Sequence, residues 1–250
     1  MASVTMIPRE ALEWLSGTER TSILLIGASG GYATALARSG HSVTVVDENT
    51  TALSRLASWH YGSIHVVAAK ADALPFDPSY FTVVLAIQNL HTFAPGLALA
   101  EWARVLRPDG WVGLSYRSRD DSVPWVKKLK RIVQSHCPEA MTSDYAAESA
   151  VALKSSAYFS DIETTSFRSW VPSTRAQLQD SARHAPGADQ LDEPELTAML
   201  DEIGGLYDEY ARVPDPMMLP YQIQCWRATV DQSRLTTSLI PGDEGLSISL

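Results

Sequence analysis

The sequence predicts an α/β protein with a Rossmann-like, doubly wound and mostly parallel sheet. In the first half of the chain, short apolar runs alternate with helical patterns. The first apolar run ends in a glycine-rich loop, and the second ends in acids. Strands of a parallel sheet, buried on both faces, appear as continuous apolar runs, and the helices between them form right-handed crossovers.

The first elements form a βαβ unit. We expect a short helix over Pro8–Leu15, and then the apolar run Ile23–Gly27 as a buried strand that stops at glycine. A helical pattern follows to Ser39, and the run Ser42–Glu48 is a second strand. Two strands joined through a helix are expected to lie parallel in one sheet.

The alternation continues to a fifth strand. The pattern predicts the following elements, the last of them after the turn sequence RPDG: a helix at Thr50–Trp59, strands at Ile64–Ala68 and Phe81–Ile87, a helix from about Leu97 to Leu106, and a strand at Trp111–Arg117. Five strands connected by helices place helices on both faces of the sheet.

After Arg117 the pattern becomes mainly helical. Ser122 is expected to cap a helix that has Pro124 in its first turn, because both residue types favour helix starts. We further expect two late strands, at residues 161–167 and Met217–Val230, and helices at Ser173–Ala182 and Glu193–Ala211. The late strands add an antiparallel element to the sheet, and the helices form a small cap.

These elements predict one domain over residues 1–230. The helical cap elements fall within about residues 123–155 and 173–215. Residues 231–250 are rich in Ser, Thr and Gly without periodicity, which is typical of a mobile tail.

Charge and cysteine usage narrow the function classes. The chain has 20 Lys and Arg against 29 Asp and Glu, a net charge of −9 that repels nucleic acid and anionic lipid. Cys137 and Cys225 fit no zinc or disulfide spacing, so we expect no metal and a reducing, cytoplasmic location. The N-terminus lacks signal-peptide order, and polar residues interrupt the longest uncharged run, Pro78–Ala100. The oligomeric state stays open between monomer and homodimer.

Polar or glycine-rich residues follow four of the predicted strands, where ligands bind in a doubly wound sheet. These four places are Gly27-Ala28-Ser29-Gly30-Gly31, Asp47, Asp72, and Gln88 to His91. Small residues in the first place let the backbone turn sharply and approach a ligand closely. Tight turn packing is the alternative explanation for the glycines.

Two acids among these places have specific chemistry. Asp47 lies 20 residues after Gly27 and can accept both hydroxyl protons of a ribose. It would alternatively cap the next helix, a role open to Asn49 or Thr50 as well. Asp72 can accept from an exocyclic amine such as that of adenine, or it is a solvated loop acid.

The four places together resemble the class I S-adenosylmethionine (SAM)-dependent methyltransferases over Pro8 to Arg117. The likeness is most specific in ADALPFDPSYFTVVLAIQNLHTF and ALAEWARVLRPDGWVGLSY. Further along, RDDSVPWVKKL and LPYQIQCWRA are similar to a bacterial branch with trans-aconitate-methyltransferase-like enzymes, which extends the likeness to Val230.

The resemblance implies SAM as cofactor and a role for each candidate residue. Its implied contacts are Gly27, Ser29 and Gly31 with the methionine part, Asp47 with the ribose, Asp72 with the adenine amine, Ala73 with the adenine ring, and Gln88 near the sulfonium. Ala28 and Glu48 join the cofactor contacts as neighbours of these residues. His91 matches a position at which this branch often has a histidine facing the substrate.

Three residues depart from the family pattern. Leu25 replaces an acid, Ser29 replaces the middle glycine, and Thr82 replaces the aspartate that usually opens the fourth strand. The missing acid removes an anchor for the loop or for the SAM amino group.

The leading hypothesis is a SAM-dependent methyltransferase acting on a small-molecule acceptor by O- or N-methylation. His91 would be the base for a hydroxyl or amine acceptor, and Arg117 or Arg119 would clamp a carboxylate acceptor, unless they are solvated charges pairing nearby aspartates. A degenerate methyltransferase fold that binds a ligand or partner without catalysis is the alternative. A short-chain NAD(P)-dependent oxidoreductase is disfavoured. Such enzymes need a tyrosine four residues before a lysine, and none of the nine tyrosines has a lysine at that position.

Overall fold

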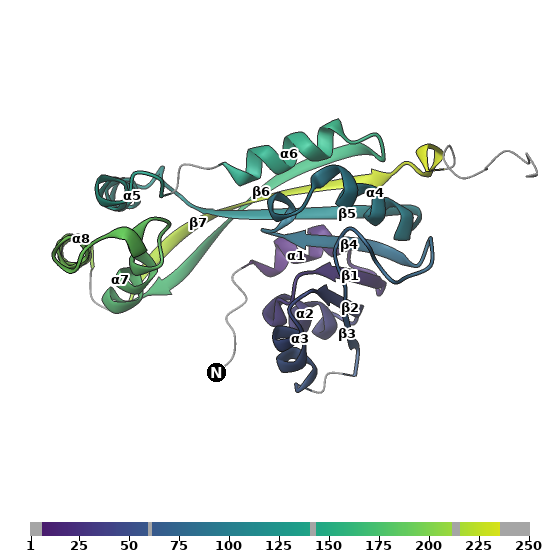
Figure 1. Ribbon diagram of the computed structural model, residues 1–250, viewed down its shortest axis with the longest axis horizontal. Helices are drawn as coiled ribbons and strands as arrows, with labels where there is room; N and C mark the ends of the chain where they lie inside the picture. The colour runs from purple at the N-terminus through teal and green to yellow at the C-terminus, as the bar shows by residue number, and fades with distance from the viewer. Residues whose placement is uncertain (1–6, 60–61, 141–143, 212–215, 236–250) are drawn as a thin grey trace, which may run out of the picture. The chain divides into compact units, whose positions relative to one another are not determined.

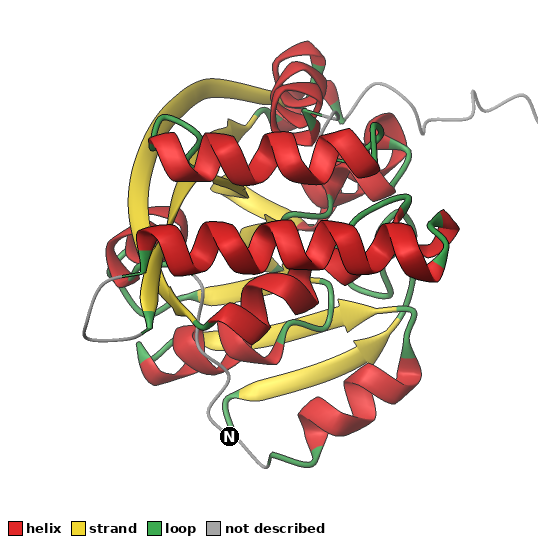
Figure 2. Cartoon of the chain, turned by 90° about the vertical axis from the view of Figure 1, so that its left-hand side faces the viewer, coloured by secondary structure: helices red, strands yellow, loops and turns green. Residues whose placement is uncertain are grey.

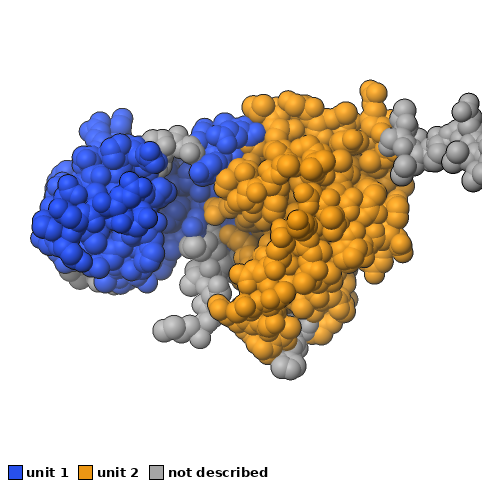
Figure 3. All heavy atoms as spheres, viewed as in Figure 1, with its two compact units in different colours: residues 1–15, 115–148, 164–225 blue, residues 16–114, 149–163, 226–250 orange. Residues whose placement is uncertain are grey.

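The computed structural model in Figure 1 describes residues 7–59, 62–140, 144–211 and 216–235. The chain divides into two compact units, which Figure 3 shows in different colours. Unit 1 contains residues 1–15, 115–148 and 164–225. Unit 2 contains residues 16–114, 149–163 and 226–250.

The strands of unit 2 confirm the predicted parallel sheet. Strand β1 (Ser22–Ile26) lies between β2 (Ser42–Asp47) and β4 (Phe81–Ile87) and runs parallel to both. Strand β3 (Ile64–Ala68) pairs with β2, also in parallel. Four of the five residues of β1 are buried. This central position explains why β1 is an uninterrupted apolar run, since both of its faces are covered.

Three more strands complete a seven-stranded sheet of order β3-β2-β1-β4-β5-β7-β6. They are β5 (Leu106–Arg119), β6 (Phe159–Ser173) and β7 (Met217–Val230), and residues of each belong to both units. The late strands are antiparallel, so the sheet is mixed but mostly parallel, as predicted. The predicted fold class is therefore confirmed.

Helices α2 (Gly30–Arg38) and α3 (Thr50–Ala57) lie beside β2 and β3 in unit 2 (Figure 1). Helix α4 (Pro95–Val105) follows β4 and begins with proline at its first turn, where the missing N–H costs nothing. It buries Leu99, Trp102 and Val105 on one side. Helix α1 (Arg9–Ser16) precedes the sheet, and α6 (Tyr145–Ser155) precedes β6.

Unit 1 contains three of the helices in the ranges that the sequence analysis assigned to a cap, whereas α6, also in those ranges, is divided between the units. The three are α5 (Pro124–His136), α7 (Arg175–Arg183) and α8 (Glu193–Tyr210), and α8 packs against the other two. Figure 2 shows α5 and α8 side by side along their length. Their apolar faces share one core. The fully buried members of that core include Val126, Val133, Met199 and Ile203.

The predicted cap of α5 is wrong by one residue. Val123 is the N-cap and makes no side-chain capping bond. Ser122 lies just before it, and its backbone amide and hydroxyl both donate to Asp120 Oδ1, at 3.2 and 2.5 Å. The aspartate therefore holds the serine in a turn, and the helix begins at Pro124 as its ring favours.

The predicted turn RPDG before the fifth strand is also corrected. Strand β5 begins at Leu106 and includes this segment, with Asp109 in a left-handed conformation at φ 63°. A local kink thus occurs inside the strand. Likewise β6 extends to Ser173, and α7 starts only at Arg175, because Thr174 and Gln177 form a capping box there.

The first residues after β7 form hydrogen bonds with other residues of unit 2. The Asp231 amide donates to Tyr158 O at 2.8 Å, and Gln232 Nε2 donates to Leu106 O at 2.6 Å. The rest of the expected mobile tail, residues 236–250, lies outside the described residues. Among the helices that are described, none combines the length and apolarity needed to cross a bilayer.

Candidate active site

The candidate site lies at one edge of the sheet in unit 2. Strands β1, β2 and β4 are parallel neighbours and end at Ile26, Asp47 and Ile87. Their carboxyl ends therefore meet at the same edge, where open α/β sheets bind ligands. Ten of the predicted residues lie at these ends or follow them or the end of β3. They are Gly27, Ala28, Ser29, Gly31, Asp47, Glu48, Asp72, Ala73, Gln88 and His91.

Asp47 joins the second strand to the glycine-rich loop. Its Oδ2 accepts a hydrogen bond from the Ala28 amide at 2.6 Å, and its Oδ1 accepts from the Asn49 amide at 2.8 Å. The sequence analysis left open whether Asp47 caps the next helix. Asn49 is that cap, because its side chain accepts from the Ala52 amide at 3.0 Å.

The glycine loop is tightly folded before α2. Gly27 has φ 93°, a conformation that side chains disfavour, and its amide donates to Val46 O at 2.7 Å. The Ser29 amide donates to Gly27 O at 2.7 Å. The amides of Ala28 and Ser29 are thus both engaged within the protein.

Asn89 is a residue of this edge that the sequence analysis did not assign. Its Nδ2 donates to Ile26 O at 2.7 Å, which ties the end of β4 to the end of β1. Its Oδ1 is buried and has no hydrogen-bond partner among the described residues. A Cβ on Gly27 would lie 2.9 Å from Asn89 Nδ2, so the loop comes this close only because residue 27 is glycine.

Gln88 and His91 occupy the segment after β4. Gln88 is exposed and has φ 58°, a left-handed conformation that is uncommon outside glycine. Backbone strain of this kind clusters at functional sites. His91 is half-buried in the one-turn helix Leu90–Thr92.

The remaining loop residues differ in exposure. Ser29 is the N-cap of α2 without a side-chain capping bond, and Gly31 lies in the first turn. The indole of Trp59 covers Gly30 so closely that a Cβ there would lie 2.5 Å from the ring. Glu48 is exposed.

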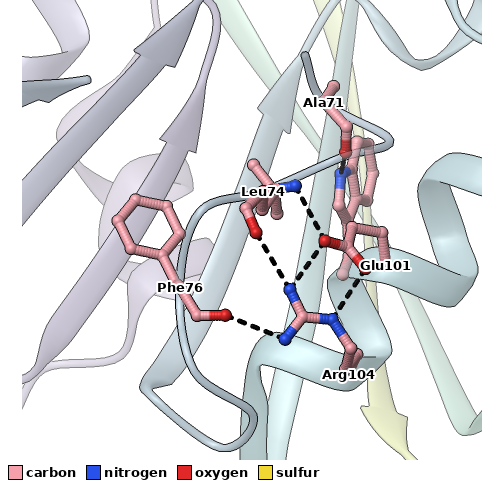
Figure 4. Close-up of polar contacts among 6 residues, drawn as sticks. Ala71, Leu74, Phe76, Glu101 and Arg104 are labelled. Atoms are coloured by element: carbon pink, nitrogen blue, oxygen red, sulfur yellow. Dashed lines mark hydrogen bonds and ion pairs between the residues drawn. The ribbon is translucent and has the colours of Figure 1, made fainter. Parts of the chain in front are cut away.

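The loop that carries Asp72 and Ala73 is fixed by α4, as Figure 4 shows. Three neighbouring side chains of that helix bind its backbone. Trp102 Nε1 donates to Ala71 O, Glu101 Oε1 accepts from the Leu74 amide, and Arg104 donates to Leu74 O and Phe76 O, all between 2.7 and 3.0 Å. Asp72 and Ala73 themselves are exposed.

Glu101 and Arg104 form a two-pronged ion pair, with contacts of 2.7 and 2.8 Å. Burial raises the pKa of Glu101, but hydrogen bonds from Arg104 and the Leu74 amide outweigh it and leave the pKa below its ordinary value. The pKa of Arg104 is raised, mainly by its hydrogen bond to Glu101. Both groups are consequently charged at neutral pH.

Two of the departures from the family pattern have structural roles. Leu25 is fully buried in β1 between Val45 and Leu85. The Thr82 hydroxyl lies 3.3 Å from Ser22 Oγ, within hydrogen-bond distance, at the start of β1 and β4 and hence at the opposite edge from the site.

The other two predicted residues, Arg117 and Arg119, belong to unit 1. The guanidinium of Arg117 stacks over the Tyr221 ring at 4.3 Å from its centroid. Arg119 Nη2 donates to Ser181 Oγ at 2.7 Å, and its buried Nη1 has no hydrogen-bond partner in the part of the chain described. Over the described ranges, no cluster of His, Cys, Asp and Glu has the arrangement of a metal site.

A doubly wound sheet with a glycine loop after its first strand, and an acid at the end of the second, defines a Rossmann-like protein of the kind that binds nucleoside cofactors. Residues 24–114 match the sequence profile of the methyltransferase domain. Over these residues the chain is thus similar to the methyltransferases.

Relatives with known sequences show the same similarity. The chain is 33% identical over 127 residues to an uncharacterized methyltransferase of Mycobacterium tuberculosis, covering 50% of this chain and 52% of the relative. It spans about half the length of the curated relatives that it matches.

Solved structures show the same fold. A protein described as a type II methyltransferase of Anaeromyxobacter dehalogenans has a TM-score of 0.64 at 20% identity, with 89% of this chain and 95% of that chain covered. The [4+2]-cyclase SpnF has a TM-score of 0.51 at 17% identity, with 89% and 80% covered. At these identities the likeness concerns the fold alone.

Proposed function

We propose that this protein is a SAM-dependent methyltransferase acting on a small-molecule acceptor. The observation that carries the proposal is the bond from the Ala28 amide to Asp47, which brings the glycine loop and the acid of the second strand together. A ribose bound by Asp47 would have the glycine loop directly beside it.

The residues at this edge fit SAM. Gly27 lets the loop pass close to Asn89, since a Cβ there would lie 2.9 Å from Nδ2, and the buried Oδ1 of Asn89 is left as an acceptor without a partner among the described residues. Asp47 keeps lone pairs for ribose hydroxyls beyond its two backbone bonds, since a carboxylate offers about four acceptor positions. Asp72, exposed after β3, can accept from the adenine amine.

SAM supplies an activated methyl group on its sulfonium, so the protein has to align the acceptor and exclude water. We assign His91 as the base that takes the proton of a hydroxyl or amine acceptor. For a carboxylate acceptor no base is needed, and Arg117 and Arg119 are the candidate cations for its negative charge. The net charge of −9 argues against nucleic-acid acceptors. Cys137 and Cys225 are free and buried, which suits a reducing compartment such as the cytoplasm.

Titration calorimetry with SAM and with its demethylated product, S-adenosylhomocysteine (SAH), tests the proposal. We expect both ligands to bind with dissociation constants in the micromolar range, which corresponds to about −8 kcal/mol. Neither heat nor thermal stabilisation at millimolar ligand would contradict it.

The second candidate is a protein of this fold without methyl transfer. Leu25, Ser29 and Thr82 favour it, and the likeness to a cyclase shows that the fold accommodates other chemistry. This candidate predicts that SAM, if it binds, stays methylated in the presence of a broad set of acids, phenols and amines. SAH formation, followed by mass spectrometry, separates the two functions.

A further inference from the structure

The loop between Ala71 and Phe76 has its shape imposed by side chains of α4. Its backbone groups at Ala71, Leu74 and Phe76 are bound by Trp102, Glu101 and Arg104 (Figure 4). The loop's own regular structure is one isolated bridge between Lys70 and Ala73. The helix therefore determines where the loop lies.

Glu101 and Arg104 are suited to hold a loop rigidly. They bind each other through two hydrogen bonds, and each also binds the backbone of Leu74, one at its N–H and the other at its carbonyl. The Glu101 side chain is only 16% exposed, so water competes weakly for its oxygens. Charged hydrogen bonds of this kind are stronger than neutral ones.

Asp72 and Ala73 are the exposed residues between these fixed points. A carboxylate on a free loop samples many positions and gains little from one hydrogen bond, because ordering the loop costs entropy. Because α4 holds Ala71 and Leu74, the backbone at Asp72 has little freedom left to lose when a ligand binds.

We propose that Glu101 and Arg104 are positioning residues for Asp72, and that they determine how strongly the site selects a nucleoside with an amino group on its base. The inference rests on the proposed function, in which Asp72 accepts from the adenine amine. If Glu101 and Arg104 only helped to pack α4 against the sheet, their substitution would lower the stability of the protein without changing its selectivity for that amine.

The experiment compares two ligands by calorimetry: SAH and its desamino analogue, in which hydrogen replaces the adenine amine. We expect the wild-type protein to prefer SAH by about tenfold or more, as one hydrogen bond to a carboxylate provides. Glu101→Gln and Arg104→Lys should reduce this preference to within about threefold, and should do so mainly by weakening SAH. Glu163→Gln breaks an exposed ion pair with Arg227 in the same unit and should leave the preference intact.

A double-mutant cycle shows whether the pair acts through Asp72. In an Asp72→Ala background, Glu101→Gln should cause no further loss of preference, because the group it positions is gone. The backbone N–H groups of residues 71–74 and of Phe76 should also exchange hydrogen faster in Glu101→Gln without ligand.

Three results would overturn the inference. The first is an unchanged preference in folded Glu101→Gln and Arg104→Lys, and the second is an equal loss for both ligands. Unchanged hydrogen exchange at residues 71–74 and Phe76 is the third, and it needs no ligand. A wild-type protein that binds neither ligand would overturn the proposed function, and this inference with it.

Discussion

Asp47 Oδ2 accepts a hydrogen bond from the backbone amide of Ala28, with 2.6 Å between the two atoms. The acid at the end of one strand thus holds the glycine loop at the end of its neighbour. This bond and that from Asn89 to Ile26 O anchor the loop from both sides. The loop's shape and the expected ribose contact consequently depend on the same carboxylate.

Asp47→Ala should weaken SAH binding by roughly ten- to a hundredfold, because hydrogen bonds to a charged acceptor typically contribute about 1.5–3 kcal/mol. The protein should remain folded, since the strand core around β1 does not involve this side chain. Calorimetry and circular dichroism measure the two effects. Glu19→Gln, which neutralises an exposed acid elsewhere in unit 2, is the matched control. Equal affinity in Asp47→Ala and wild type would show that Asp47 has only a structural role.

Gly27→Ala should destabilise the protein by about 1–2 kcal/mol, since alanine disfavours positive φ and the new Cβ would meet Asn89. SAH affinity should fall with it, because the loop has to move. Gly96→Ala is the control: no atom lies within 4 Å of its Cβ position and the residue is helical, so stability should stay equal or rise. Urea unfolding of both variants decides the comparison. Equal effects at the two glycines would contradict a special role for Gly27.

Asn89→Asp should be less stable at pH 7 than Asn89→Ala. The aspartate would place a partly buried negative charge against Ile26 O, where the asparagine donates at 2.7 Å. Burial raises the pKa of such a carboxyl above its unfolded value, so the unfolded state loses its proton first as pH rises. The stability deficit, about 1–3 kcal/mol, is therefore present at pH 7 and shrinks as pH falls toward 4. Urea unfolding at both pH values measures it, and a deficit that grows on acidification would refute the assignment of the Nδ2 donor.

The strands and the ligand-binding edge were predictable because they depend on local signals. Four consecutive buried residues in β1 require an apolar run, and the turn into α2 requires small residues. The expectation that Asp47 lies at this edge followed from its distance to Gly27 along the chain.

Other features depend on contacts between distant residues. Glu101 and Arg104 resemble any solvated i, i+3 pair on a helix, and nothing local shows that they bind a loop 27 residues earlier. Asn89 looks like an ordinary loop residue until β1 lies beside β4. Ser122 is of a residue type that often caps helices, but its hydroxyl donates to Asp120 instead. Sequence patterns report local propensity, and such tertiary contacts override it.

His41 should make the protein less stable in acid. It is buried before β2, and its Nδ1 has no hydrogen-bond partner among the described residues. Burial lowers the pKa of His41 from its ordinary value of 6.5. As pH falls, the unfolded state therefore binds a proton at this histidine before the folded state does. The contribution of His41 to the free energy of unfolding is therefore fully present above pH 6.5. It is lost as pH falls below that value, by at most about 1.4 kcal/mol per pH unit.

Urea unfolding between pH 7.5 and 5.5 tests this dependence, since His41→Gln should flatten it over about two pH units. His65 in β3 is exposed, and His65→Gln should keep the wild-type slope. A slope that is the same in all three proteins would mean that another group causes any loss of stability in acid.

The last prediction concerns His91, which follows β4 at the same edge as Gln88. If His91 is the base, His91→Ala should lower turnover by about 10²- to 10⁴-fold and leave SAH affinity nearly unchanged, because the imidazole acts on the acceptor. A screen of small acids, phenols and amines must first supply an acceptor. Asp47→Ala should show the opposite pattern, with weaker SAH binding and a smaller effect at saturating SAM. Full turnover in His91→Ala with a hydroxyl or amine acceptor would remove its catalytic role, whereas a carboxylate acceptor would transfer the test to Arg119→Met.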